Sequence, residues 1–79
     1  AYVNPTLFTG VKNSMSIAQQ EIFGPVASVI EFNGVDEAIR IANDTIYGLA
    51  SAAWTRDLDT AFRLVRGIEA GIVWVNCFD

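Results

Sequence analysis

Two short segments of the chain repeat apolar residues at the spacing of one helical face, and this pattern limits the possible folds more than any other feature. Residues at i, i+3, i+4 and i+7 lie on the same side of an α-helix. The first stripe consists of Val35, Ala38, Ile39 and Ala42, and the second of Leu58, Ala61, Phe62 and Val65. The stripes predict helices near 35–44 and 57–69.

The residues at the ends of these segments support both helices. Acidic residues fall in each first turn, where the helix dipole favours negative charge; they are Asp36 and Glu37 in the first helix and Asp57 and Asp59 in the second. The first helix is expected to end near Asn43-Asp44. Thr55 or Asp57 is the expected N-cap of the second helix, and Gly71 its expected terminator.

Four mostly apolar runs, several of them rich in β-branched residues, alternate with the helical segments. Proline, glycine or asparagine lies at one or both ends of each run, so we predict strands near 6–11, 25–32, 49–55 and 71–76. A weaker helical segment, 14–20, lies between the first two strands, with Asn13 or Ser14 as its N-cap. Strands that alternate with amphipathic helices predict an α/β fold with parallel strand pairing.

The composition indicates an ordered chain with apolar surface that packs against other polypeptide. The chain has 79 residues, of which 52% are hydrophobic and 18% charged, whereas disordered chains have low hydrophobicity and high charge. This length allows at most one small domain, in which so many apolar side chains cannot all be internal. The chain also begins without Met and stops after an apolar run, so we expect a piece of a longer protein.

Charge and cysteine content exclude several classes of function. The net charge is −4 and the five cations are scattered, so the basic patch of a nucleic-acid-binding protein is missing. No apolar run approaches the roughly 20 residues of a membrane helix. Cys77 is the single cysteine and there is no histidine, which leaves neither an internal disulfide nor a metal site. This cysteine usage fits a reducing compartment, and we predict the cytoplasm.

The stretch from Gln20 to Pro25 places a carboxylate and an aromatic ring two residues apart, just before a glycine-proline break. Such a break lets the backbone turn sharply and holds Glu21 and Phe23 at the entrance of a strand. A carboxylate there can accept two hydrogen bonds from vicinal hydroxyls, such as those of a ribose, and an aromatic face can pack on a flat ring. From the spacing alone, however, a charge at a helix end beside a core phenylalanine is the more common arrangement.

The sequence resembles the aldehyde dehydrogenase superfamily along essentially its whole length. Five segments carry the resemblance in the family's order and spacing: Pro5-Thr6-Leu7-Phe8, Glu21-Ile22-Phe23-Gly24-Pro25, Ala42-Asn43-Asp44-Thr45 with Tyr47-Gly48-Leu49-Ala50, Trp54-Thr55-Arg56-Asp57, and Gly71-Ile72-Val73-Trp74-Val75-Asn76. The chain is thereby expected to be an incomplete part of the catalytic domain, residues 1–79, a partial parallel β-α-β layer. Gln20 departs from the commonest form of the motif, which has a second glutamate there.

The resemblance implies roles for individual residues. Glu21 resembles the glutamate that hydrogen-bonds the nicotinamide ribose hydroxyls, and Phe23 resembles the aromatic residue that packs beside that ribose and the nicotinamide. Phe78 and Asp79 follow a strand end that leads, in the family, to the mouth of the aldehyde tunnel, so they either line this tunnel or form a plain loop. Cys77 is not expected to be the nucleophile, because the family's catalytic cysteine lies in an upstream G-Q-x-C motif that this chain does not contain.

The implied function is NAD- or NADP-dependent oxidation of an aldehyde to a carboxylic acid, in a protein that forms a homo-oligomer. In this interpretation the chain positions the cofactor and relies on the rest of the enzyme for catalytic residues and for substrate binding. By itself it is predicted to be inactive. The alternative is a non-catalytic α/β module with a structural or interaction role, which would look the same over these residues.

Overall fold

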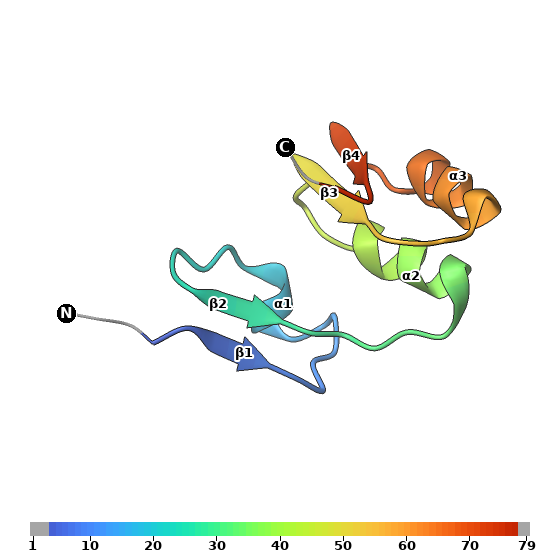
Figure 1. Cartoon of the computed structure of the whole chain (residues 1–79). Helices are drawn as coiled ribbons and strands as arrows, with labels where there is room; N and C mark the ends of the chain where they lie inside the picture. The colour runs from blue at the N-terminus through green and yellow to red at the C-terminus, as the bar shows by residue number, and fades with distance from the viewer. Residues whose placement is uncertain (1–3, 78–79) are drawn as a thin grey trace. The chain divides into compact units, whose positions relative to one another are not determined.

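A computed structural model describes residues 4–77 of the chain (Figure 1). Its elements alternate as the sequence predicts: β1 (Thr6–Phe8), α1 (Ser16–Gln19), β2 (Val26–Ser28), α2 (Gly34–Asn43), β3 (Ala50–Ala53), α3 (Leu58–Gly67) and β4 (Ile72–Val75). They form two compact units, one ending at Phe32 and the other beginning at Asn33. Each unit contains one pair of parallel strands, so the predicted α/β class with parallel pairing is confirmed.

The first unit is a β-α-β motif in which β1 and β2 pair in parallel. Thr6, Leu7 and Phe8 lie opposite Val26, Ala27 and Ser28, in that order. The helix α1 packs on one face of the pair, where the Ser28 hydroxyl donates a hydrogen bond of 3.3 Å to the carbonyl of Ile17. Because side chains alternate along a strand, Leu7 and Ala27 belong to the opposite face, and both are exposed.

Both strands of this unit are shorter than the sequence predicts. The chain turns at Gly10, whose φ of 64° is in the left-handed region that glycine tolerates. The predicted strand 6–11 therefore ends at Phe8. Because most of the predicted strand 25–32 then has no strand to pair with, that strand is also short and covers only Val26–Ser28. The amide of Val29 still donates to the carbonyl of Phe8 over 2.7 Å, one step beyond the last strand residue.

The start of α1 also differs from the prediction. Neither Asn13 nor Ser14 is its N-cap; Met15 takes that place and contributes no side-chain hydrogen bond. A tight turn in which the amide of Met15 donates to the carbonyl of Lys12, 2.9 Å away, precedes the helix and shifts its first residue to Ser16. With four residues and no capping side chain, α1 depends on its packing against β2.

The second unit has the order α2, β3, α3, β4, and its strands also pair in parallel (Figure 1). Ala50 lies opposite Ile72 and Ala53 opposite Val75. At one end of the ladder the amide of Gly71 donates to the carbonyl of Gly48 over 2.8 Å, and at the other the amide of Asn76 donates to the carbonyl of Ala53 over 2.8 Å. These two bonds bracket strands that were predicted near 49–55 and 71–76.

The helices α2 and α3 pack closely at the end of α3. A Cβ atom placed on Gly67 would lie 2.6 Å from Cδ1 and 3.0 Å from Cγ2 of Ile39, so any side chain at this position would require the Ile39 side chain to shift. Asn43 joins the two helix ends. Its amide nitrogen donates to the carbonyl of Gly67 over 2.7 Å, and its amide oxygen accepts from the backbone N–H of Glu69 over 2.8 Å. Arg63 and Asp36 add an exposed ion pair between the helices.

The expected terminator of α3 has a different role. The helix ends at Gly67, with Ile68 as its C-cap, four residues before Gly71. Gly71 instead lies immediately before β4, where an added Cβ would lie 3.1 Å from the carbonyl oxygen of Leu49. The glycine therefore permits the close approach of two backbones and does not stop the helix.

The apolar stripe of α3 is only partly turned toward its own unit. Leu58, Phe62 and Val65 of the predicted stripe are exposed, whereas Ala61 is half-buried. Leu64 and Ile68, which are outside the stripe, are half-buried as well. One side of α3 thus packs within the second unit, and a second apolar side faces outward, where the Arg66 guanidinium lies 5.9 Å from the centre of the Phe62 ring.

Asp57 is the N-cap of α3. Of the two expected caps, Thr55 and Asp57, the structure therefore has the second. Its carboxylate accepts a hydrogen bond of 2.7 Å from the Thr60 hydroxyl and one of 3.3 Å from the backbone N–H of Asp59. The Thr60 hydrogen bond, together with the backbone N–H groups of Asp59 and Thr60, lowers the pKa of Asp57 below its ordinary value of 3.8, and desolvation opposes this shift only in part. The ionised form is therefore the one that the folded helix favours.

This lowered pKa predicts how the first turn of α3 responds to pH. A carboxyl group with a lowered pKa in the folded state stabilises it above its unfolded pKa, and the stabilisation disappears as the pH falls through the folded pKa. In a folded protein that contains this segment, Asp57→Ala is expected to speed amide hydrogen exchange at Asp59 and Thr60 several-fold near neutral pH. The difference from the unaltered protein should vanish well below pH 3.8. A comparable effect of Asp59→Ala, which removes no side-chain cap, would contradict the capping role.

Candidate functional site

The segment from Gln20 to Pro25, which links α1 to β2, carries both residues that the sequence assigns to the cofactor. It is fixed at each end by backbone hydrogen bonds. The amide of Gln20 donates to the carbonyl of Ser16 over 2.9 Å and closes α1, while the carbonyl of Pro25 accepts from the amide of Thr6 over 2.7 Å. The segment is therefore a short loop held between a helix and a two-stranded ladder.

The glycine-proline pair at the end of this loop forms a tight turn. The amide of Val26 donates to the carbonyl of Gly24 over 2.8 Å, so the chain reverses around Pro25 immediately before β2 begins. An added Cβ on Gly24 would meet no atom within 4 Å. The turn places the preceding residues, Glu21 to Phe23, outside the ladder.

Both candidate side chains are exposed. The ring of Phe23 is 92% accessible and so takes no part in the core of its unit. Glu21 is exposed and makes no hydrogen bond or ion pair with any other residue in the range 4–77. The loop thus presents a carboxylate with unused acceptor capacity and an uncovered aromatic face, two residues apart.

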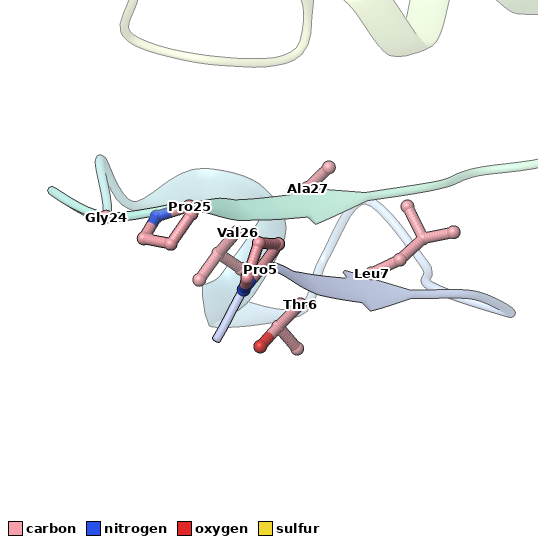
Figure 2. Close-up of a pocket in the computed structure, with 7 residues that line it drawn as sticks. All are labelled: Pro5, Thr6, Leu7, Gly24, Pro25, Val26 and Ala27. Carbon is pink, nitrogen blue, oxygen red and sulfur yellow. The ribbon is translucent and has the colours of Figure 1, made fainter. Parts of the chain in front are cut away.

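A groove of about 480 Å³ begins where this loop joins the sheet (Figure 2). It is lined by the first residues of the two strands and the turns before them, Pro5, Thr6, Leu7, Gly24, Pro25, Val26 and Ala27. Figure 2 shows Leu7 and Ala27 projecting to one face of the ladder and Thr6 and Val26 to the other, as the pairing register requires. The groove is mostly apolar, and Gly24 and Pro25, which follow Phe23 directly in the sequence, are among its lining residues.

The second unit carries a separate hollow at the carboxyl ends of its two strands. Trp54, Thr55, Arg56 and Asn76 line a volume of about 430 Å³. Asn76 has a φ of 56°, and among residues 4–77 it is the only residue other than glycine with a positive φ. Its side-chain oxygen accepts a hydrogen bond of 2.9 Å from the backbone N–H of Thr55.

The remaining candidate residues are placed only in part. Cys77 is a free, exposed thiol. Phe78 and Asp79, the candidate tunnel residues, lie outside the described residues. No group of three or more residues suited to hold a metal ion exists between residues 4 and 77. In the same range no helix has the length and apolar character to cross a membrane.

Sequence reasoning missed the two asparagine side chains that join neighbouring elements. Asn43 was expected only as a helix end and Asn76 only as a strand end, yet each bonds backbone groups more than 20 residues away in the chain. The signal that could have identified them is local. Asparagine at the end of a helix or strand offers both a donor and an acceptor to a backbone that has lost its regular partners.

The fold makes this chain an α/β protein assembled from parallel β-α-β units. A model described as the aldehyde dehydrogenase family matches residues 1–79, and the chain belongs to that family. The fluoroacetaldehyde dehydrogenase of Streptantibioticus cattleyicolor is 61% identical over 77 residues, which are 98% of this chain and 15% of that protein. Aldehyde dehydrogenase family 2 member B4, mitochondrial, of Arabidopsis thaliana is 56% identical over 78 residues, 99% of this chain and 14% of that protein.

Solved structures of the family superpose closely. The aldehyde dehydrogenase KauB from Pseudomonas aeruginosa matches with a TM-score of 0.95 and 59% identity, over 99% of this chain and 16% of that one. A mutant of the P. syringae indole-3-acetaldehyde dehydrogenase AldA, in complex with NAD+ and IAA, matches with the same TM-score, identity and coverage. The chain thus spans about 15% of the length of the curated relatives it matches.

Proposed function

We propose that these residues form part of an NAD(P)-dependent aldehyde dehydrogenase and that the loop from Gln20 to Pro25 holds the nicotinamide ribose. One observation carries the proposal: in a chain of this family, a loop fixed at both ends presents an uncommitted carboxylate and a 92% exposed aromatic ring two residues apart. Membership of the family supports the class of enzyme, and the loop supports the role of this segment within it.

The chemistry of the two side chains fits the proposed ligand. A carboxylate is an acceptor with two oxygens, so Glu21 could receive both hydroxyls of one ribose. Phe23 offers a flat apolar face that would pack on a sugar or a heteroaromatic ring. The loop could therefore fix both the position of the ribose and the orientation of the ring attached to it.

The proposed role of Glu21 is positioning. When bound, the cofactor supplies a hydride acceptor for the oxidation of an aldehyde to an acid. Glu21 and Phe23 would hold the ring where the reacting carbons meet, and a misplacement of about 1 Å can cost on the order of 100-fold in rate. The ordered anchor points on either side of the loop reduce the freedom that binding must remove.

The other parts of the proposal concern the complete enzyme. The nucleophilic cysteine and the general base would come from outside these 79 residues, and Cys77 would be structural. Phe78 and Asp79 are proposed to line the aldehyde tunnel. No single aldehyde is proposed, since relatives named for fluoroacetaldehyde and indole-3-acetaldehyde match about equally well.

The proposal extends to cofactor, assembly and compartment. NAD+ is present in the matched P. syringae structure, and NAD or NADP is proposed here. We also propose a homo-oligomer, as the resemblance to the family implies. The cytoplasm is proposed from the single cysteine, while the matched Arabidopsis relative is named as mitochondrial.

The test replaces the corresponding segment of the P. aeruginosa aldehyde dehydrogenase with these 79 residues. At 59% identity and a TM-score of 0.95, the graft should preserve the fold. We expect the chimera to reduce NAD+ with an aldehyde, within about tenfold of the parent rate. The isolated chain should show no turnover with NAD or NADP.

Two outcomes would contradict the proposal. A folded chimera that binds no cofactor would favour the alternative of a non-catalytic α/β module. Turnover by the isolated chain that Cys77→Ser abolishes would show that the nucleophile lies within this segment. When Glu21 is replaced by glutamine in the chimera, Glu31→Gln is the matched control, because Glu31 is also an exposed carboxylate in the first unit.

A further inference from the structure

The helix α3 carries an apolar strip on a side that it does not use for packing in its own unit. Leu58, Phe62 and Val65 are at i, i+4 and i+7, so they lie along one line of the helix surface. Their exposed fractions are 68%, 53% and 44%, in that order. The side of the helix that packs inward is a different one, since Leu64 is half-buried and Gly67 lies against α2.

A second exposed strip beside the apolar one has opposite charges at its two ends. Asp59 in the first turn and Arg66 in the last turn are at i and i+7, and both are exposed. The Arg66 guanidinium lies 5.9 Å from the centre of the Phe62 ring, so the two strips are in contact. Arg63, by contrast, is paired with Asp36 of α2. The helix dipole favours this order of charges, but it does not account for the apolar strip next to them.

The two strips together are complementary to a second copy of themselves. A two-fold interface uses the same patch on both chains, and two helices that meet across such an axis run antiparallel. With the axis near Phe62, the middle residue of the apolar strip, Asp59 of each copy meets Arg66 of the other. Leu58 of each copy then lies near Val65 of the other. A partner of uniform charge would instead leave one end of the charged strip facing a like charge.

We propose that the outer face of α3, made up of Leu58, Asp59, Phe62, Val65 and Arg66, docks on the same face of a second copy of this chain. The inference deepens the homo-oligomer of the proposed function, on which it rests, by assigning a surface to it. A helix of ten residues is about 15 Å long, so the contact is smaller than the roughly 800 Å² per partner of a standard interface. It is therefore weak by itself, and its exposed ion pairs make it sensitive to salt.

The experiment reverses one charge of the outer face at a time in the full-length chimera. In Asp59→Arg and in Arg66→Asp, two identical copies bring like charges together at both ends of the antiparallel contact. We expect the dissociation constant of this contact to rise roughly tenfold in each variant. In an equal mixture of the two variants every arginine again faces an aspartate, so association should return to that of the unaltered chimera. Sedimentation at several protein and salt concentrations measures it.

Glu31→Arg is the matched control, because it reverses an exposed charge outside α3 and should leave association unchanged. Unchanged association in both α3 variants would overturn the inference and indicate that the rest of the enzyme covers this face. Weaker association that the mixture does not restore would also overturn it, in favour of a different partner surface. Should either charge variant fail to fold, Phe62→Ser decides, since the ring is 53% exposed: weaker association supports the inference and unchanged association overturns it.

The proposed function and this inference fail in different measurements. Association is measured without substrate, so a chimera that assembles but does not oxidise an aldehyde contradicts only the proposed enzyme. A chimera that is active but whose association is insensitive to the charges of α3 contradicts only the proposed contact.

Discussion

Replacing Glu21 by glutamine in the active chimera is expected to slow hydride transfer roughly 10- to 100-fold. Glutamine has nearly the same shape but carries no charge and one acceptor oxygen in place of two. A hydrogen bond to a charged group contributes about 1.5–3 kcal/mol, and each 1.4 kcal/mol is a factor of about ten in rate. The measurement is nicotinamide reduction in a single turnover, which separates hydride transfer from product release.

The fold should not change in this variant, and that makes the rate informative. Glu21 is exposed and bonded to no other residue between positions 4 and 77, so nothing local is lost with its charge. Glu31→Gln removes a charge from the same unit and should leave the rate unchanged. If Glu21→Gln reduces NAD+ as fast as the unaltered chimera, Glu21 is a surface charge at a helix end and the ribose contact must be reassigned.

The helices of the second unit could be predicted closely from the sequence. The spacing of Val35, Ala38 and Ile39 predicts a helix near 35–44, and the structure has one at Gly34–Asn43. The predicted helix near 57–69 is found at Leu58–Gly67. Helices depend on bonds between residues four apart, so the information that specifies them is local.

Strand ends could not be predicted as closely, because they depend on a distant partner. The β-branched run that follows Val26 is suited to a long strand, but it pairs with a segment that turns at Gly10. The same reasoning applies to Asn43 and Asn76, whose amide groups bond to backbone far along the chain. Single-sequence patterns contain no information about which backbone groups will be left without partners.

The candidate cofactor residues, Glu21 and Phe23, are predicted from the family motif. The spacing of the two residues alone favours a structural role for them. A glutamate two residues before a phenylalanine most often marks a helix end beside a core ring. In the structure Glu21 lies just beyond the helix, and the Phe23 ring is not in the core of its unit. Only the folded structure shows that a large apolar ring is exposed next to a carboxylate without a hydrogen-bond partner within residues 4–77. The sequence does not indicate which face of a loop is covered.

The isolated chain is expected to self-associate or aggregate and to melt without a cooperative transition. Among residues 4–77, Val11 at 5% and Ala53 at 8% accessibility are the only buried hydrophobic residues. Ile46 and Leu49, by contrast, are 89% and 87% accessible. Small domains without disulfides or metals need a well-filled core to fold alone, and the described part of this chain does not supply one.

Gel filtration combined with near-UV circular dichroism distinguishes the possible states. Open edges of two-stranded ladders and uncovered apolar faces promote association, so the elution volume should correspond to oligomers or aggregate. Near-UV bands of the tryptophans should be weak, because loosely packed rings lack a fixed environment. A substitution such as Leu49→Ser should lower association without producing a cooperative melt, since it adds polarity but no core. A monodisperse monomer with a sharp melt would instead show that the half-buried contacts of the two units are sufficient, and that the apolar faces are surplus to folding and reserved for assembly.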